Sequence, residues 1–207
     1  MKKVLVCAAA ILTTTPAFSY GDHSSWSSYR GSYYSDAYQF TTGVEVLQTA
    51  LTVTDPSTDT STVTQYRGLG FKTSVGTELA RFVRFDVFNT YQDISADPLH
   101  SIRGAELGGD IRLSFAGPVA NLNFGLGLFG SSLVNQTPTS SYRYYGQGCV
   151  GLFEIEKFLS PASSFSFTVA GKQQTLKPES SSVLTRSQLN TLGISFGVTL
   201  WLKSNTY

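Results

Sequence analysis

The chain has 207 residues, a length that suits one β domain rather than two. Its formal net charge of +1 excludes the strongly basic surface of a nucleic-acid-binding protein. Charged residues make up 14% of the chain, against about 25% in typical soluble domains, while aromatic residues reach 13% and there are 19 glycines. This combination favours a membrane β-barrel over a soluble globular domain.

Residues 1–19 are predicted to be a secretory signal peptide. Two lysines are followed by an apolar run of nine residues, and Ala17-Phe18-Ser19 offers small residues for cleavage. The run is shorter than the roughly 20 residues of a membrane-spanning helix, and Cys7 comes too early in it for a lipoprotein signal. We therefore expect an exported chain in which Cys149 is the one remaining cysteine and forms no intramolecular disulfide.

Residues 20–37 are rich in Ser and Tyr and show no clear period, which predicts a flexible periplasmic arm. Residues 38–202 alternate between apolar and small or polar positions, and residues 203–207 form a short tail. Successive side chains of a strand point to opposite faces, so this alternation predicts an eight-stranded antiparallel up-and-down transmembrane β-barrel. The predicted strands are Tyr38–Thr54, Val63–Val75, Arg81–Gln92, Ala105–Phe115, Val119–Gly130, Tyr142–Lys157, Ser164–Thr175 and Leu192–Leu202.

The last predicted strand, LGISFGVTLWL, has the clearest pattern. One face is wholly apolar, and the other carries Gly193, Ser195, Gly197, Thr199 and Trp201, with no charged residue on either face. In the first strand, Leu47, Leu51 and Val53 are out of phase with the preceding residues, which predicts a β-bulge near Leu47.

The predicted connections alternate between long polar loops and short turns. Both termini would then lie on the short-turn side, as in bacterial outer-membrane barrels. The long loops are Asp55–Thr62, Asp93–Ile102, Leu133–Ser141 and Leu176–Arg186, and the short turns are Gly76–Ala80, Ala116–Pro118 and Leu159–Ser163.

Alternation alone does not separate a membrane barrel from a secreted lipocalin, which is apolar inside. The polar face of this chain is largely Gly, Ser, Thr and Asn, which suits a narrow lumen better than a water-facing surface. Aromatic residues gather near strand ends, as in the girdles of membrane barrels. They are Tyr38, Phe40, Tyr91, Phe115, Tyr142, Tyr144, Tyr145 and Phe158.

Charged residues of the strands fall on the polar face and are predicted to form a network in the lumen. The network comprises Glu45, Lys72, Arg84, Asp86, Glu106, Asp110, Arg112, Glu154 and Lys172. An unpaired charge in a poorly hydrated lumen is costly, so we expect mutual pairing, with Lys72 beside Asp86 and Arg84 near Asp110. The network could act as a salt-bridged plug or as a polar passage for ions.

The chain resembles the small outer-membrane β-barrel superfamily that includes the OmpA barrel domain, the OmpX and OmpW types and the opacity proteins. The stretches that carry the resemblance are GLGFKTSVGTELARFVRFDVF, NLNFGLGLFG, EIEKFLSPASSFSFTVAGK and LGISFGVTLWL. The resemblance implies an eight-stranded barrel in the outer membrane of a Gram-negative bacterium, in contact with its lipid and lipopolysaccharide. These families include adhesins, structural tethers and narrow channels, so function does not follow from the fold.

The final strand also resembles the C-terminal signal that barrel-assembly machinery recognises. Ser195, Gly197, Leu200 and Leu202 match its polar, Gly, hydrophobic and hydrophobic positions. Such proteins usually end on the last aromatic residue of the strand, whereas five residues follow here.

Enzyme chemistry is not expected. Barrels that acylate or deacylate lipid A need a His and a Ser placed together. His23 lies in the arm, and His100 and Ser101 are neighbours that point apart on an extended loop. Asp97 and His100 are too few ligands to predict a metal site, and no cofactor is predicted. We expect a structural or adhesin-like role through four extracellular loops, which could bind a host or matrix ligand. The alternative is a narrow channel for small or apolar solutes.

Overall fold

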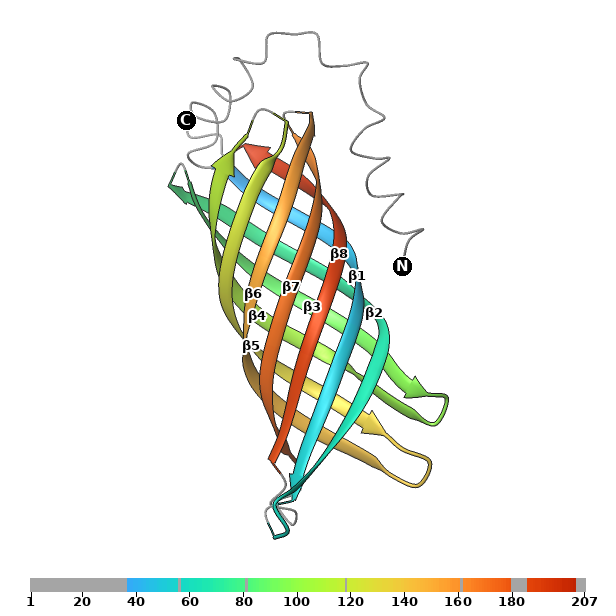
Figure 1. Ribbon diagram of the computed structural model, residues 1–207. Coiled ribbons are helices and arrows are strands. Elements are labelled where there is room, and N and C mark those ends of the chain that lie inside the picture. The colour runs from blue at the N-terminus through green and yellow to red at the C-terminus, as the bar shows by residue number, and fades with distance from the viewer. Residues whose placement is uncertain are drawn as a thin grey trace.

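A computed structural model describes residues 37–55, 57–80, 82–117, 119–160, 162–179 and 186–203. The predicted signal peptide, the arm before Ala37 and the tail after Lys203 lie outside these residues. The described chain forms a closed antiparallel barrel in which each strand pairs with the next and β8 pairs with β1 (Figure 1). The strands are β1 Ala37–Asp55, β2 Thr60–Ala80, β3 Val83–Asp97, β4 His100–Ala116, β5 Asn121–Gln136, β6 Ser141–Ser160, β7 Ser163–Pro178 and β8 Arg186–Lys203.

The barrel has two unlike ends. At the terminal end β1 begins and β8 finishes, and at the distal end β1 turns into β2 (Figure 1). Following the paired residues once round the barrel from Thr42 returns to β1 at Thr52, ten residues farther along. A stagger of this size requires steeply tilted strands. No helix among the described residues is long and apolar enough to cross a membrane.

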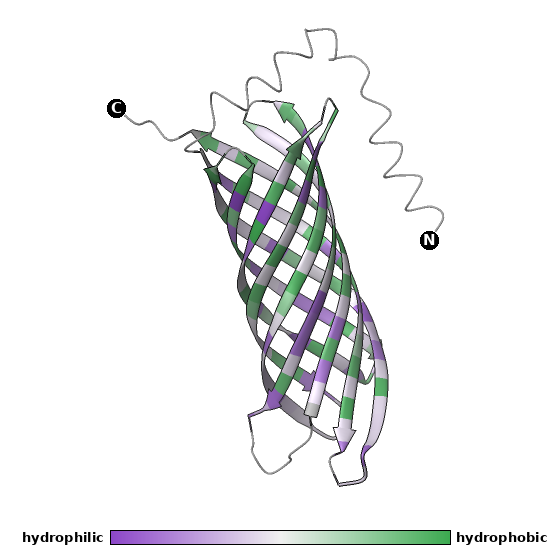
Figure 2. Ribbon diagram, turned by 60° about the vertical axis from the view of Figure 1, so that its left-hand side comes forward, coloured by the Kyte–Doolittle hydropathy of each residue, from purple (hydrophilic) through white to green (hydrophobic). Residues whose placement is uncertain are grey.

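The polar face of the strands lies inside the barrel, as predicted. Hydrophobic and hydrophilic positions alternate along the strands (Figure 2). Leu126 and Leu128 on the outer wall are 77% and 72% exposed, whereas Asp86 and Glu106 are fully buried in the lumen. A lipocalin has the opposite arrangement, because its apolar side chains line the inside. The choice of a membrane-type barrel over a lipocalin therefore agrees with the structure.

Three of the four expected long loops are wrong, whereas seven residues separate β7 from β8 and most of them lie outside the described residues. At the distal end β3 and β4 are separated only by residues 98–99, and β1 and β2 only by residues 56–59. The residues predicted to form long loops mostly continue the strands, so that hairpins project from the distal end (Figure 1). Their polar composition predicted loops, but polar side chains, those of β-branched threonine above all, also occur on exposed strands.

The predicted bulge near Leu47 is also wrong. β1 keeps an unbroken register with both β2 and β8 along this segment. Leu47 and Leu51 are buried because they point into the lumen, on the same face as Glu45. Along β1 the same face therefore points into the lumen throughout. Its side chains change from polar to apolar because the lumen itself becomes apolar toward the distal end.

Most of the predicted girdle residues lie on the outer wall, but two do not. Tyr144 is directed inward and packs against buried leucine and isoleucine side chains of the lumen. Phe158 shares the inward phase of Glu154 and Glu156, and its ring centroid lies 5.6 Å from that of Trp201. The exposed members are Tyr38, Phe40, Tyr91, Phe115, Tyr142 and Tyr145.

Candidate functional site

The candidate site is the lumen, and its terminal half holds a network centred on Glu154. Arg84 donates to Glu154 at 2.9 Å and Arg112 donates to it at 2.8 Å. Asp86 lies between the same two guanidinium groups, 2.8 Å from Arg84 Nε and 3.0 Å from Arg112 Nε. Asp110 accepts from Arg112 at 2.6 Å. Both arginines therefore bind several carboxylates at once, which is how buried charges are retained in proteins.

Neutral side chains extend this network toward the terminal end. Asn123 donates to Glu154 at 2.7 Å, and Ser164 donates to Glu156 at 2.5 Å. Trp201 of β8 then donates from its indole nitrogen to Ser164 at 3.2 Å. The network thus links charged groups on β3, β4 and β6 to the strand that closes the barrel.

A second group of charges lies nearer the middle of the barrel. Lys172 donates to Glu106 at 2.9 Å and to Glu45 at 3.3 Å. Lys72 places its ammonium 4.7 Å from the centroid of the Phe88 ring, a favourable cation–π distance. All nine predicted network residues point inward, but the structure divides them into these separate groups.

The predicted pairings of Lys72 with Asp86 and of Arg84 with Asp110 are wrong. Lys72 lies opposite Thr90, and Arg84 lies opposite Arg112. β2 continues to Ala80 and β3 begins at Val83, so the turn comes later than expected and every pair across that hairpin moves. Across the β3–β4 hairpin the shift is two residues, since Arg84 meets Arg112 where Asp110 was expected. Register follows from turn position, so an error of a few residues changes each cross-strand partner.

The sequence prediction also left two lumen acids out of the network. Glu78 and Glu156 are both buried. Glu156 follows Glu154 at period two, a signal that could have placed it in the network, whereas Glu78 was assigned to a turn. With these two, the described side chains of the lumen include seven carboxylates and four basic groups.

The distal half of the lumen is filled by an apolar cluster, here called the distal plug. Each of its members is at least 94% buried, and they come from seven of the eight strands. The distal plug consists of Leu47, Leu51, Tyr66, Ile94, Ile102, Leu133, Leu176 and Leu189. Sequence reasoning missed it, since Leu47 and Leu51 were explained by a bulge and four other members fell in segments predicted to be loops. These four are Ile94, Ile102, Leu133 and Leu176.

Between the charges and the distal plug lie buried polar atoms that have no hydrogen-bond partner in the described protein. They include both side-chain polar atoms of Gln92, the hydroxyl of Thr90 and Oε1 of Glu106. Buried polar groups are rarely left unsatisfied in proteins. Asp86, Thr90, Gln92 and Glu106 are 0% exposed, so no water molecule reaches these side chains. A side chain lining an open aqueous bore would stay accessible, so the lumen is closed at this level.

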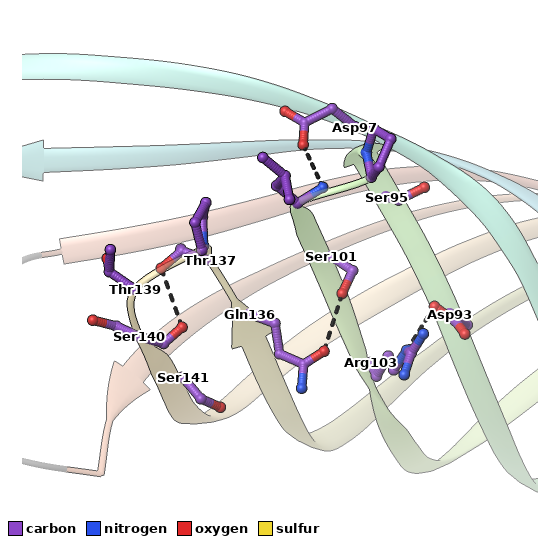
Figure 3. A pocket seen from close by; sticks show the side chains of 13 residues that line it. Asp93, Ser95, Asp97, Ser101, Arg103, Gln136, Thr137, Thr139, Ser140 and Ser141 are labelled. Atoms are coloured by element: carbon purple, nitrogen blue, oxygen red, sulfur yellow. Dashed lines mark hydrogen bonds and ion pairs between the residues drawn. The ribbon is translucent and has the colours of Figure 1, made fainter.

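At the distal end, a cleft of about 710 Å³ lies between the β3–β4 and β5–β6 hairpins (Figure 3). Arg103 donates to Asp93 at 3.1 Å across one hairpin, and Ser101 donates to Gln136 at 3.4 Å between the two hairpins. Figure 3 shows these polar side chains along the cleft, with Thr137 and Ser140 at its other side. The cleft is polar and solvent-exposed.

The His100 segment is built as a turn. Asp97 accepts hydrogen bonds from the N–H groups of Leu99 and His100 at 2.8 and 3.0 Å, and His100 Nδ1 lies 2.8 Å from its Oδ2. These contacts, with the His100 ring first, lower the pKa of the Asp97 carboxyl below its usual value. Ser101 is turned to Gln136. Among the described residues, His, Cys, Asp and Glu form no group of three that could hold a metal ion.

The four residues matched to an assembly signal occupy both faces of β8. Ser195 and Gly197 face the lumen, while Leu200 and Leu202 face outward and are about half exposed. Their recognition by assembly machinery stays a prediction. Cys149 is exposed on the outer wall of β6.

Comparison with known proteins shows the fold and no closer relationship. No protein-family model matches the chain, and no curated protein matches its sequence. Among solved structures, neisserial surface protein A superposes with a TM-score of 0.53 at 13% identity, covering 77% of this chain and 96% of its own. The outer membrane protein OprG from Pseudomonas aeruginosa gives a TM-score of 0.54 at 12% identity, covering 83% and 98%. The chain thus has the fold of small outer-membrane β-barrels.

Proposed function

We propose that this chain is a closed outer-membrane barrel whose role is structural or surface-interacting, carried by the projecting distal hairpins. Large apolar side chains cover the outer wall of every strand, and Leu107, Leu126 and Leu128 are each more than 60% exposed. A water-facing surface with an apolar band of this extent would aggregate. The band is explained if lipid covers it.

The height of the band supports insertion into a bilayer. On β1 the outward residues are apolar or threonine from Tyr38 to Val46 and become polar at Gln48. A transmembrane strand needs about 9–11 tilted residues, which fits this segment. Exposed aromatic residues lie at both edges, with Tyr38 at the terminal end and Tyr91 toward the distal end.

The closed lumen favours a structural or interaction role over the alternative of a narrow channel. The single observation that carries this choice is the complete burial of Asp86, Thr90, Gln92 and Glu106 beneath the distal plug. With the termini in the periplasm, the distal hairpins would lie outside the cell. Their polar strands extend beyond the apolar band and offer the surface for a host or matrix ligand.

Three measurements test this proposal. On a denaturing gel of the membrane fraction, we expect the protein to change its migration on boiling, as folded barrels do. We expect planar bilayers with refolded protein to show no unitary conductance. We expect proteases added to intact cells to cleave at the distal turns only. Reproducible conductance that is lost in Glu106→Gln would replace the proposal with the channel. Recovery of the protein in the soluble periplasm, with the same gel migration before and after boiling, would exclude a membrane location.

A further inference from the structure

A hollow of about 630 Å³ lies on the outer wall of the barrel, over β1, β2, β6, β7 and β8. Four exposed carboxamide side chains border it, and we call it the amide hollow. These are Gln48, Gln65, Gln173 and Asn190. Lys172 is the one member of the lumen network at the hollow, and its side chain points away from it.

The strand register places these residues in a continuous row. Gln173 lies opposite Asn190 across the β7–β8 pair, and Ala50 of β1 joins Asn190 to Gln65 of β2. Cys149 of β6 lies opposite Gln173 and extends the row at its other end. Residues paired in this way project from the same face of a sheet, so their side chains form one surface.

The floor of the hollow is made of small residues that packing does not require. Gly151 and Gly171 lie opposite each other on β6 and β7. A Cβ at Gly171 would meet no atom within 4 Å, and at Gly151 the nearest atom would be 3.7 Å away. A glycine weakens a strand when nothing approaches it closely, so these two positions leave space on the outer wall without a gain for the barrel itself.

The chemistry of the hollow is polar and uncharged. Each carboxamide carries donors and an acceptor, and therefore matches a hydroxyl group from either side. The one charged side chain at the hollow, Lys172, points into the lumen and binds Glu106 and Glu45. Arg67, opposite Gln48 on β2, is the one outward cation paired with a residue of the row, and it lies at its edge. A phosphate or carboxylate group would therefore find a single cation, whereas a neutral ligand with many hydroxyl groups would find partners along the whole row.

The level of the hollow fits the membrane surface. Leu192 lines the edge of the hollow nearer the terminal end and belongs to the apolar band. Gln48 pairs directly with Leu192. A ligand in the hollow would therefore keep its chains against the apolar band and its polar part against the carboxamides.

We propose that the amide hollow binds the uncharged sugar headgroup of a glycolipid in the outer leaflet. This inference rests on the proposed membrane location. The sugar hydroxyl groups hydrogen-bond to Gln48, Gln173 and Asn190, the sugar ring sits over Gly151 and Gly171, and the acyl chains follow the lipid-facing wall below Leu192.

Cys149 provides the measurement, because it is exposed at the edge of the hollow. The full chain has two cysteines, so a Cys7→Ser variant has Cys149 as its single thiol. This variant is refolded into phosphatidylcholine vesicles with or without digalactosyl diacylglycerol, and labelling by a water-soluble maleimide is timed. We expect the glycolipid to slow labelling several-fold, and soluble galactose or phosphatidylglycerol to leave it unchanged.

Variants then locate the site. Replacing Gln173 and Asn190 together by Leu removes several hydrogen bonds and should weaken the protection about tenfold. Gly171→Leu fills the floor and should also abolish protection, while Asn89→Leu, an outward substitution on β3, should leave it intact. Each variant is first checked for the boiling-dependent gel shift, so that failure to insert is recognised separately.

The outcomes are distinct. Equal labelling rates in all vesicles with properly inserted protein would overturn the inference and leave the proposed barrel standing. Slowing by phosphatidylglycerol or by soluble galactose would overturn it by pointing to another ligand. A Cys149 disulfide dimer would also overturn it, because a second copy would then occupy the hollow. Failure of the parent chain to insert would refute the proposed function itself.

Discussion

Replacement of Arg112 by Met is the most informative test of the lumen network. Arg112 binds Asp86, Asp110 and Glu154, and it is 3% exposed. Met keeps most of the volume and removes the charge. Asp86 and Glu154 keep Arg84, but Asp110 loses the partner that lies 2.6 Å away. Breaking a buried ion pair in this way costs about 3–5 kcal/mol, a large share of the roughly 5–15 kcal/mol that stabilises a typical protein.

A second substitution separates the cost of an unpaired charge from the cost of altered packing. Asp110→Asn in the Arg112→Met background removes the uncompensated carboxylate, so we expect the double variant to recover about 1–3 kcal/mol of coupling energy. Urea unfolding in lipid vesicles, followed by tryptophan fluorescence and by the gel shift, gives the free energy of unfolding of each variant. The values can be compared if the m-value is the same for all variants.

Comparison with an acid tests how the buried charges are shared. Arg112 binds three carboxylates, whereas Glu154 binds two arginines, so loss of this base should cost more than loss of this acid. Glu154→Gln keeps the shape of the side chain but only one of its two accepting oxygens, because the NH2 group would face the donors of Arg84 or Arg112. We expect a cost of about 1–3 kcal/mol. A cost for Arg112→Met below about 1 kcal/mol, or strict additivity with Asp110→Asn, would refute the reasoning that the buried pairs are coupled.

Other parts of the barrel give further predictions. Leu189→Ala should destabilise the barrel by about 2–5 kcal/mol in the same urea assay, because it opens a cavity in the distal plug; an unchanged midpoint would mean that the plug is loosely packed. Gly68→Ala should strongly impair folding, since its Cβ would lie 2.1 Å from a backbone oxygen of β3, whereas Gly171→Ala should fold normally; equal yields would contradict this. The lowered pKa of Asp97 means that its turn contacts stabilise the β3–β4 hairpin above about pH 4, the usual carboxyl pKa, and are lost as the pH falls through the lower folded value. Protection of the Leu99 amide against exchange, relative to an unfolded chain at the same pH, should therefore fall in acid, and Asp97→Asn should remove that pH dependence.

The number of strands and their phase could be predicted because polar and apolar positions recur at period two. The charges were decisive here, since Glu106, Asp110 and Arg112 fall on one face of β4 and fix which side is the lumen. The sixth strand has the weakest alternation, and its phase was still found by turning Glu154 and Glu156 inward.

Pairing and lumen content could not be predicted to the same extent. Partners depend on where a turn falls, and no residue near Glu78 marked the turn at residues 81–82. The distal plug was hidden because Leu47 and Leu51 carry no signal that distinguishes a lumen-facing leucine from a lipid-facing one. The amide hollow needed the register, which brings Gln65, Gln173 and Asn190 into one row from three distant segments.

The two halves of the lumen have different physical consequences for the fold. A slip of one residue would turn β4 so that Asp110 and Arg112 faced lipid, where an arginine at mid-bilayer costs about 2–4 kcal/mol. The distal plug opposes such a slip less strongly, because lipid accepts a leucine as readily as the lumen does. β8 carries no charged side chain from Ser187 to Leu202, and at its seam with β1 Thr199 and Thr191 hydrogen-bond to Thr41 and Thr49 at 2.8 and 3.0 Å. We infer that the buried charges specify the register of β3, β4 and β6, and that the closing strand depends on these threonine pairs and on the Trp201–Ser164 hydrogen bond.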